Sequence, residues 1–384
     1  MKKICFVTTV PITIKSFLLG FSKYLIETGD YDVTFMCNED EVLREMCNEH
    51  LHFIPVAMKR GVGFDGITVI NKMTRIFKIQ NFDIVQYSTP NASFYASIAA
   101  ARANVPCRLY CQWGIRYMGF RGFPRLIFKH IEKLICKRST VIEVESLSLM
   151  KFSLAEGLYS KDKASVIWNG SACGVNLEKF NYKKRAELRA QIRKDLDIAE
   201  DDVVFGYAGR ITRDKGINEL VDAFIGAKGN EKAKLLLIGD FDNARTMRPD
   251  VVDTIDKSGN IKHIGWVKNV EQYYAAMDVF CSLSYREGFG IVVIEAGAMA
   301  TPGIVSYVPG QIDTIIDGKT GFFAEVKNVE SIRNAIEIFI SRPKLAEEMG
   351  LNARKHVEES YNDVELFSRL TEHRNQLIFD NRYA

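Results

Sequence analysis

The amino-acid sequence predicts an α/β protein built from two doubly wound, Rossmann-like domains. Short apolar runs alternate with segments that have the apolar spacing of amphipathic helices, and this alternation starts afresh after a charged stretch near the middle of the chain. Strands that alternate with helices form parallel sheets that are covered on both faces. The chain has 384 residues, which is enough for two domains with complete cores.

The first half carries the first series of these elements. The N-terminal apolar run is interrupted by Thr8, Thr9, Pro11, Thr13 and Lys15, so we interpret it as a strand followed by a loop rather than as a signal peptide. The expected strands are 4–7, 32–37, 83–87, 108–111, 140–144 and 164–168, and the expected helices are 15–28, 69–77 and 92–102. We therefore predict an N-terminal domain over residues 1–182.

The second series follows a polar stretch, 181–201, which we interpret as a linker and an exposed helix. The expected strands are 203–207, 234–238, 262–264, 279–283, 303–306 and 321–324, and the expected helices are 218–227, 270–276, 291–299 and 329–339. We predict a C-terminal domain over residues 183–363, with ligand in a cleft between the carboxyl ends of the two sets of strands. Residues 364–384 have a helical pattern, and we expect this helix to cross back to the N-terminal domain.

Composition excludes several classes of protein. Hydrophobic residues make up 47% of the chain and charged residues 26%, values that are ordinary for a soluble globular protein. The sequence contains no uninterrupted apolar run of about 18 residues, so we expect no transmembrane helix. The net charge of +3 is too small to indicate nucleic acid as a partner, and the eight cysteines form no metal-binding pattern. We therefore expect a cytoplasmic protein with reduced thiols and no metal site.

The stretch CSLSYREGFGIVVIEAGAMA, residues 281–300, combines a strand, a glycine-bounded loop and a helix. The glycines on either side of Phe289 allow the backbone to approach a ligand, and the helix that begins at Ile291 presents free N–H groups that favour an anion such as phosphate. Glu287 precedes the glycines and Glu295 lies about one turn into the helix. Because carboxylates would repel a bound anion, we expect both to accept hydrogen bonds from hydroxyl groups. The stretch thus predicts a site for a phosphorylated, hydroxyl-rich ligand.

The stretch YAGRITRDKG, residues 207–216, places two cations at the start of the second half. Gly209 ends the expected strand, and Arg210 and Lys215 lie on the loop before the next helix. A guanidinium can hold two phosphate oxygens at once, and an ammonium adds a mobile point charge. Together the two side chains can neutralise a diphosphate without a metal ion.

These stretches resemble the Glu-x7-Glu motif, here EGFGIVVIE, and the GR-x4-KG segment of the retaining GT-B glycosyltransferases of family 4. The resemblance covers most of residues 160–330 and is weak in the first half. It implies a GT-B fold, in which the N-terminal domain binds the acceptor and the C-terminal domain binds a nucleotide-sugar. It also implies catalytic roles for Glu287, Arg210 and Lys215, with the two cations on the donor diphosphate. The donor-binding residues that it implies are Gly209, Arg210, Lys215, Gly265, Trp266, Glu287, Gly288, Phe289, Gly290, Ile291 and Glu295.

Three further segments are similar to the same family. VIWNGSACGVNLEKF at 166–180 resembles the segment that closes the first domain, and TPGIVSYVPGQIDTIIDGKTGFF at 301–323 resembles the stretch after the motif helix. HIGWVKNVEQYYAAMDVF at 263–280 resembles the segment whose loop lies beside the nucleotide base. Within it, Trp266 can either stack on a base or fill the end of the sheet, and we expect His263 to be an ordinary packing neighbour.

The first half departs from the family pattern at two places. Many relatives have a glycine-rich loop after the first strand, whereas this chain has threonines that can hydrogen-bond sugar hydroxyls. Relatives also often carry a histidine after the strand at 108–111, where this chain has a glutamine and a tryptophan; neither can act as a base, so we name no catalytic histidine. The acceptor-side candidates are Thr8, Thr9, Thr13, Gln112, Trp113 and Arg116.

Residues 115–138, IRYMGFRGFPRLIFKHIEKLICKR, mix seven lysines and arginines with aromatic residues. From Pro124 onward the apolar residues have helical spacing, and cations beside a partly exposed apolar face are typical of attachment to an anionic membrane surface. The apolar face can equally pack on the sheet, with the cations solvated. We keep both interpretations. The first places the protein on the inner face of the cytoplasmic membrane as a peripheral protein, and the second places it in the cytoplasm.

The resemblance implies a retaining, metal-independent hexosyl- or N-acetylhexosaminyltransferase. Its donor would be a nucleotide-sugar, with UDP as the expected nucleotide, and its acceptor a glycan or a polyprenyl-diphosphate-linked saccharide. The expected setting is the assembly of a surface polysaccharide such as an O-antigen or a capsule.

Two alternatives stay open. The Asp-x-Asp at Asp240 and Asp242 is typical of metal-dependent transferases of the other common fold. The missing histidine and glycine loop instead favour a catalytically silent subunit that binds a nucleotide-sugar. A sugar epimerase of the same architecture would need first-domain acids and histidines that the sequence does not place convincingly.

Overall fold

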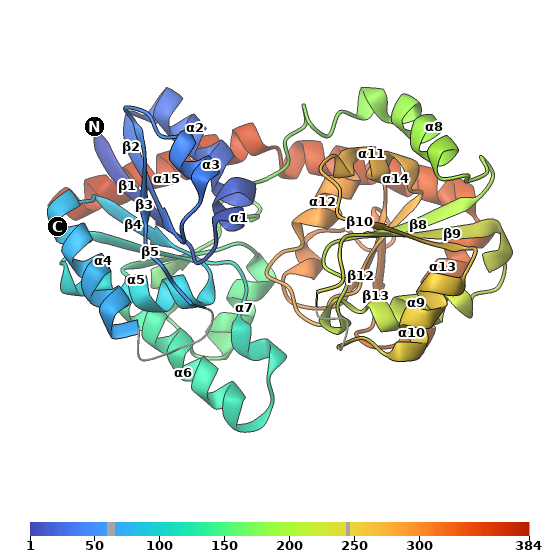
Figure 1. Cartoon of the computed structure of the whole chain (residues 1–384), viewed down its shortest axis with the longest axis horizontal. Helices are drawn as coiled ribbons and strands as arrows, with labels where there is room; N and C mark the ends of the chain where they lie inside the picture. The colour runs from blue at the N-terminus through green and yellow to red at the C-terminus, as the bar shows by residue number, and fades with distance from the viewer. Residues whose placement is uncertain (60–65, 243–245, 384) are drawn as a thin grey trace. The chain divides into compact units, whose positions relative to one another are not determined.

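The structure, a computed structural model, describes residues 1–59, 66–242 and 246–383, without the side chains of 381–383. It divides the chain into two compact units (Figure 1). Unit 1 consists of Met1–Cys173 and Val364–Ala384, and unit 2 of Gly174–Asp363. We expected the first domain to end at residue 182, but the units part at Gly174. This glycine packs on the backbone of Asp363, and Val175 pairs with Asn362, so the chain has already joined unit 2 at that point.

Unit 1 is built on a parallel sheet that has seven strands within the described residues, in the order β3-β2-β1-β4-β5-β6-β7. The strands are β1 (Lys2–Val7), β2 (Tyr31–Cys37), β3 (Leu51–Pro55), β4 (Ile84–Tyr87), β5 (Cys107–Gln112), β6 (Val141–Val144) and β7 (Ala164–Ser165). The strands expected from the sequence did not include β3. It is an edge strand that ends in Pro55, and proline is tolerated only at such positions, so its sequence carries a weak strand signal.

Helices cover both faces of this sheet. They are α1 (Pro11–Thr13), a π-helical turn (Ile14–Leu18), α2 (Leu19–Gly29), α3 (Glu41–Glu45), α4 (Gly66–Gln80), α5 (Pro90–Arg102), α6 (Gly122–Arg138), α7 (Leu147–Ala155) and α15 (Asp363–Tyr383). Alternate residues of β1 point to opposite faces: Ile4 and Phe6 join the core under α2 and α15, and Cys5 and Val7 join the core under α4, α5 and α6.

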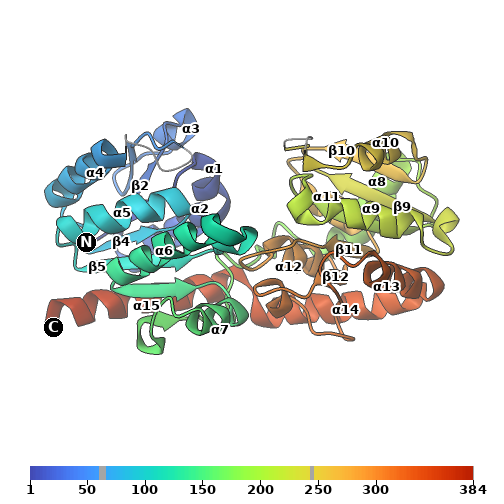
Figure 2. The same ribbon diagram turned by 90° about the horizontal axis from the view of Figure 1, so that it is seen from below.

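The C-terminal helix α15 packs along the sheet of unit 1 (Figure 2). Leu366, Phe367, Leu370, Leu377 and Ile378 are buried in the same core as the strand residues, and each such side chain contributes about 1.5–3 kcal/mol to folding. The helix therefore belongs to unit 1 by packing, although about 190 residues of unit 2 separate it from the rest of that unit in the sequence.

A buried ion pair fixes the position of α15. Arg374 is 1% exposed, and its guanidinium contacts both carboxylate oxygens of Glu143 on β6. Its Nη2 also donates to Oε1 of Gln86 on β4 at 3.0 Å, and Nδ1 of His373 lies 3.2 Å from Oε2 of Glu143. Burial alone would raise the pKa of Glu143, but Arg374 and His373 hold the pKa of this carboxyl far below its ordinary value.

Unit 2 is built on a second parallel sheet, with six strands within the described residues, in the order β10-β9-β8-β11-β12-β13. The strands are β8 (Val203–Ala208), β9 (Ala233–Ile238), β10 (Ile261–Gly265), β11 (Val279–Ser282), β12 (Gly303–Ser306) and β13 (Gly321–Ala324). The helices are α8 (Arg185–Asp195), α9 (Ile217–Ile225), α10 (Pro249–Lys257), α11 (Val270–Ala276), α12 (Ile291–Ala298), α13 (Val329–Ser341) and α14 (Pro343–Ser360). All the strands that we predicted for this half are present.

The core of unit 2 also has two sides. Residues of α9, α10 and α13 pack with Val203, Phe205 and Tyr207 on one face of the sheet, and residues of α11 and α12 pack with Val204 and Ala208 on the other. Two parallel, doubly wound sheets confirm the predicted fold class. Among the residues that the structure describes, no helix combines the length and apolar character that a membrane span requires.

We predict that Arg374→Leu lowers the free energy of unfolding by about 3–5 kcal/mol, because it removes the arginine partner of the buried carboxylate of Glu143. The matched control is Arg44→Leu, which removes an exposed pair with Glu39 in the same unit and should cost less than about 1 kcal/mol. Urea unfolding measures both.

The Arg374–Glu143 pair also predicts that stability depends on pH. Because the pKa of Glu143 is lower in the folded protein than in the unfolded chain, its contribution to stability is complete above its ordinary value of 4.5 and is lost as the pH falls below that value. A similar cost for both variants at neutral pH would contradict the role of this pair in holding α15.

Candidate functional site

Unit 2 reverses its strand order between β8 and β11, and the loops that follow these strands carry both predicted motifs. The chain proceeds from β8 to β9 and β10 on one side of the sheet and from β11 to β12 and β13 on the other. Ligands of open α/β sheets bind at the carboxyl ends of the strands beside such a reversal. The loop after β8 begins at Gly209 and the loop after β11 at Leu283. The candidate site lies at this point.

Lys215 and Glu287, which belong to different motifs, form an ion pair. Nζ of Lys215 lies 2.6 Å from Oε2 of Glu287, and only 22% and 25% of the two side chains are exposed. Gly216 follows Lys215 with a φ of 73°, and a Cβ at this position would lie 2.2 Å from the carbonyl oxygen of Leu283. Only glycine fits this approach, so the loop that carries Lys215 packs directly on the end of β11. The sequence predicts the two residues separately, and the fold brings them together.

The loop that carries Glu287 rests on Gly310. This glycine has a φ of 94° and a ψ of −64°, and a Cβ there would lie 2.4 Å from the carbonyl oxygen of Gly288. The next residue, Gln311, is fully buried; its Nε2 donates to Oγ of Ser282, and its Oε1 has no hydrogen-bond partner within the described residues. Neither residue was among the predicted site residues, although the Pro-Gly dipeptide at 309–310 is a signal for a tight turn.

The other residues predicted in this loop have different environments. Phe289 is 1% exposed and its ring packs edge-on against Tyr361, with ring centroids 5.4 Å apart, so its side chain anchors the loop in the core. Gly290 has a φ of 105° and precedes α12, which begins at Ile291. The side chain of Phe289 is therefore not available to a ligand, and the backbone around the two glycines is the part that can approach one.

The pKa of Glu287 lies below its ordinary value. Burial acts to raise it, but the charge and hydrogen bond of Lys215 lower it, and Ser284 and Arg286 add to the lowering. At neutral pH the side chain of Glu287 is therefore a carboxylate. Glu287 can therefore accept hydrogen bonds and stabilise positive charge.

Glu295 has the opposite character. Burial raises its pKa to about 7, although Lys179 and a hydrogen bond from Tyr274 act to lower it. The Tyr274 hydroxyl donates to Oε2 of Glu295 at 3.3 Å, from α11 to α12. A carboxyl group with this pKa is present in both forms at neutral pH and can accept a hydrogen bond from a hydroxyl or donate one. The two acids of the motif thus carry different charges.

Arg210 and Trp266 lie at the neighbouring strand ends, and both contact the segment after β9. The guanidinium of Arg210 pairs with Asp242, and the backbone N–H of Trp266 donates to Oδ1 of Asp240 at 3.1 Å. Trp266 is 71% exposed, so its side chain does not fill the end of the sheet, which was one of the two interpretations of its sequence. Gly265 ends β10 immediately before it.

His263 lies at the same strand ends. It packs edge-on against Phe241 and its Nε2 lies 2.8 Å from the carbonyl oxygen of Gly239, in keeping with an ordinary packing role. Among the described residues, no group of three or more histidines, cysteines, aspartates and glutamates is arranged to hold a metal ion.

The threonine candidates of unit 1 are buried. Thr8, Thr9 and Thr13 are buried, and Oγ1 of Thr9 lies 2.9 Å from Oγ1 of Thr89 at the end of β4. The amide N–H of Ala92 also donates to Oγ1 of Thr9 at 3.3 Å. These hydroxyls join the ends of β1 and β4, where the strand order of the first sheet reverses. The hydroxyl of Thr9 is therefore engaged within unit 1.

Gln112 is likewise committed to the core. It is 0% exposed; its Nε2 donates to Oε1 of Glu132 at 2.8 Å, and its Oε1 accepts from Ser153 and Tyr159 at 2.9 and 3.0 Å. Tyr110 donates to the same Glu132 oxygen at 2.7 Å. With all of these contacts made, the Gln112 amide ties β5, α6 and α7 together and does not face a ligand.

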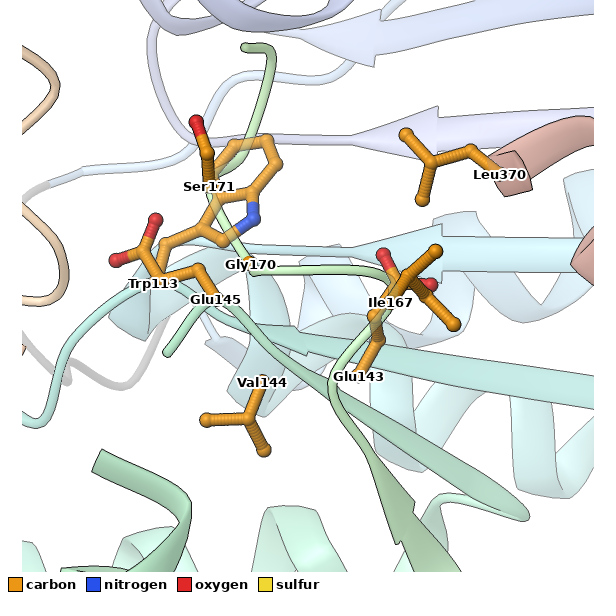
Figure 3. A pocket seen from close by; sticks show the side chains of 8 residues that line it. All are labelled: Trp113, Glu143, Val144, Glu145, Ile167, Gly170, Ser171 and Leu370. Atoms are coloured by element: carbon orange, nitrogen blue, oxygen red, sulfur yellow. The ribbon is translucent and has the colours of Figure 1, made fainter. Parts of the chain in front are cut away.

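Trp113 and Arg116 remain nearer the surface. Trp113 is partly buried against Phe17, with ring centroids 5.7 Å apart, and it lines a small hollow together with Glu145 and Ser171 (Figure 3). The guanidinium of Arg116 lies 4.4 Å from the ring centre of Phe128 on α6. No local pattern in the sequence marks Glu145 or Ser171, which reach the hollow only because β6 ends beside the segment at 167–171.

The basic, aromatic stretch at residues 115–138 has one part that packs on the core and one part that is exposed. The C-terminal half of α6 packs on the unit 1 core through Ile135 and Cys136, whereas Phe123, Leu126 and Ile127 in its first turns are 73%, 61% and 44% exposed. We call these three residues, with the exposed cations Arg121, Lys133 and Lys137, the α6 patch.

Family models match both halves of the chain. A model described as Glycosyl transferases group 1 matches residues 189–356, and a model described as Glycosyl transferase 4-like matches residues 3–146. The capsular polysaccharide biosynthesis glycosyltransferase CapM of Staphylococcus aureus is 33% identical over 342 residues, which cover 88% of each chain. A UDP-Gal:alpha-D-GlcNAc-diphosphoundecaprenol alpha-1,3-galactosyltransferase of Escherichia coli is 22% identical over 353 residues, which cover 90% of this chain and 89% of the relative.

Solved structures share the fold. The structure of Anabaena HepE in complex with UDP and glucose superposes with a TM-score of 0.80 at 17% identity, and covers 98% of this chain and 100% of that one. The sucrose-phosphate synthase of Thermosynechococcus elongatus superposes with a TM-score of 0.81 at 20% identity, and covers 99% of this chain and 100% of that one. At these identities the similarity establishes the two-domain GT-B architecture.

We predict that Gly310→Ala lowers the free energy of unfolding by about 3–5 kcal/mol, the sum of backbone strain and of a clash with the Glu287 loop. The matched control is Gly318→Ala, which also has a positive φ, 69°, but whose Cβ would meet no atom within 4 Å and should cost about 1–2 kcal/mol. Urea unfolding followed by circular dichroism measures both. Equal costs would show that Gly310 does not support the loop.

Proposed function

The chain belongs to the glycosyl transferases group 1 family and is a glycosyltransferase, and from this premise we propose that it moves a sugar from a UDP-sugar to a saccharide acceptor, with retention of anomeric configuration and without a metal ion. The observation that carries the proposal is the Lys215–Glu287 pair, 2.6 Å long, at the strand-order reversal of unit 2. It combines a cation suited to a diphosphate with a carboxylate suited to sugar hydroxyls.

In the proposed mechanism, Arg210 and Lys215 hold the donor diphosphate and neutralise the charge that develops on it. The bond between the anomeric carbon and the diphosphate oxygen breaks, and a bond from the acceptor hydroxyl oxygen to the same carbon forms on the same face. The acceptor proton passes to an oxygen of the departing phosphate, so no side-chain base is required. Glu287 stabilises the positive charge at the anomeric centre electrostatically and positions sugar hydroxyls.

The remaining residues of the donor site have supporting roles in this proposal. Glu295 hydrogen-bonds a hydroxyl of the donor, for which its pKa of about 7 suits it. Trp266, with most of its indole exposed, offers a face on which a uracil can stack. The free N–H groups at the start of α12 and the adjacent glycine backbone favour an anionic group. The UDP complexes of HepE support the choice of nucleotide by analogy.

For the acceptor, we propose a saccharide carried on a polyprenyl diphosphate in the assembly of a surface polysaccharide such as a capsule. Two relatives support the lipid-linked acceptor by name: the Escherichia coli galactosyltransferase and a Campylobacter jejuni enzyme that acts on N,N'-diacetylbacillosaminyl-diphospho-undecaprenol. The name of the Staphylococcus aureus CapM supports the setting in capsule assembly. Such an acceptor lies in a membrane, so the enzyme would work at the cytoplasmic membrane surface.

The α6 patch suits that surface. Phe123, Leu126 and Ile127 can enter the boundary between headgroups and acyl chains, where each buried apolar side chain contributes about 1.5–3 kcal/mol. Arg121, Lys133 and Lys137 can contact anionic headgroups, at about 1 kcal/mol for each cation near the surface. We propose that α6 is the element of unit 1 that contacts the membrane.

We predict that Lys215→Ala weakens UDP binding about 10- to 100-fold, because a charge-assisted contact of about 1.5–3 kcal/mol is lost. Glu287→Gln should leave UDP binding within about tenfold of the natural protein and lower the rate of sugar transfer or slow donor hydrolysis about 100-fold or more. Calorimetry with UDP and a release assay on UDP-sugars measure these effects.

The matched control for the donor site is Lys257→Ala, which removes a lysine from an exposed pair with Asp253 on α10 of the same unit. It should change neither binding nor turnover. Activity that EDTA abolishes and manganese restores would favour the metal-dependent alternative, and UDP binding without transfer to any acceptor or to water would favour the silent subunit.

We predict that the double variant Phe123→Ser/Leu126→Ser loses at least about tenfold in binding to vesicles that contain phosphatidylglycerol. The control is Ile67→Ser/Ile79→Ser, which removes two side chains on α4 of unit 1 that are 66% and 67% exposed and should bind vesicles as the natural protein does. Co-sedimentation measures both, and equal retention by the two double variants would rule out α6 as the contact.

A further inference from the structure

The Asp-x-Asp segment after β9, residues 240–242, is hydrogen-bonded through its backbone to the loop that carries Arg210. The amide N–H of Gly209 donates to the carbonyl oxygen of Ile238 at 2.9 Å, and the N–H of Ile211 donates to that of Asp240 at 2.9 Å. These bonds continue the ladder of β8 and β9 past the ends of both strands. They hold the backbone of Asp240 and Phe241, which precede Asp242, in register with the loop that carries Arg210.

The backbone of Arg210 is fixed, whereas its side chain is exposed. The hydroxyl of buried Tyr207 donates to the carbonyl oxygen of Arg210 at 2.7 Å. The Arg210 side chain is 62% exposed, and its Nη1 donates to Oδ2 of Asp242, whose side chain is 48% exposed. The base of the Arg210 side chain is therefore held in place, and the charged end is paired with a carboxylate that water can reach.

The two cations of the site differ in how firmly their partners hold them. The Lys215–Glu287 pair is mostly buried, and separating it would leave two charges with little water around them. The Arg210–Asp242 pair is solvated on both sides, and measured pairs of this kind shift an equilibrium by only about twofold to fivefold. A diphosphate can therefore displace Asp242 from Arg210 much more easily than it can displace Glu287 from Lys215.

We propose that Asp242 is a displaceable counter-ion that holds Arg210 when the donor site is empty and competes with the donor diphosphate for it. The proposal rests on the proposed function of the site. Asp242 then positions Arg210 for the incoming donor, weakens the binding of UDP and of the donor, and takes Arg210 back when UDP leaves. Asp240 has a separate role, since its Oδ1 is bonded to the backbone of Trp266. The two carboxylates of the Asp-x-Asp sequence, which resembles a metal-binding motif, thus accept hydrogen bonds from protein groups: Asp242 from Arg210 and Asp240 from a backbone N–H.

The experiment is calorimetric UDP binding to the full-length protein and its variants, at low and moderate salt. Asp242→Asn removes the competing charge at nearly constant shape and should tighten UDP binding about twofold to fivefold. Asp250→Asn is the matched control, because it removes an aspartate of the same unit from an exposed pair with Arg248; it should leave UDP binding unchanged. Arg210→Ala/Asp242→Asn, compared with Arg210→Ala, should show no tightening, because the competition requires the arginine.

The outcomes separate this proposal from the one on which it rests. Equal binding of UDP by the natural protein and by Arg210→Ala would contradict the donor site itself. If Arg210→Ala weakens binding while Asp242→Asn binds as tightly as Asp250→Asn or more weakly, the donor site stands and the counter-ion role of Asp242 is overturned. Tightening by Asp242→Asn that persists without Arg210 would also overturn it, because a general loss of negative charge would then account for the effect.

Discussion

The Lys215–Glu287 ion pair depends on the way in which the second sheet is wound. Strand order reverses between β8 and β11, so the loops after these two strands meet although about 70 residues separate them in the sequence. Gly216 permits the loop that carries Lys215 to pack on the end of β11, and Gly310 packs directly against the backbone of the loop that carries Glu287. The proposed roles of Lys215 and Glu287 follow from this meeting of a cation and a carboxylate.

The charged side chains of the site differ in how deeply they are buried. Lys215 and Glu287 are mostly buried, and Lys215 lowers the pKa of Glu287. Burial raises the pKa of Glu295 to about 7, and the side chain of Arg210 is largely exposed. A diphosphate donor would thus meet one cation that is firmly placed and one that exchanges partners. This division suits an enzyme that must bind a nucleotide-sugar and also release the nucleotide.

The sequence predicted the fold class and most of its strands, but it did not predict which side chains the motif residues contact. Apolar runs and glycine spacing mark the strands, Arg210, Lys215 and Glu287, because local patterns encode them. Gln112 and Thr9 make hydrogen bonds inside unit 1, and Asp242 is paired with Arg210. Such contacts depend on which strands become neighbours. Edge strand β3 escaped notice because a short strand that ends in proline has almost no periodic signal.

Hydrogen–deuterium exchange of the full-length protein with and without UDP tests the central claim most directly, since it locates the nucleotide without any substitution. A donor site in unit 2 predicts slower exchange in peptides that cover 207–217 and 283–295, where the loops after β8 and β11 and the start of α12 lie. Protection confined to peptides of unit 1, or absent from both of these segments at saturating UDP, would contradict the assignment of the donor site.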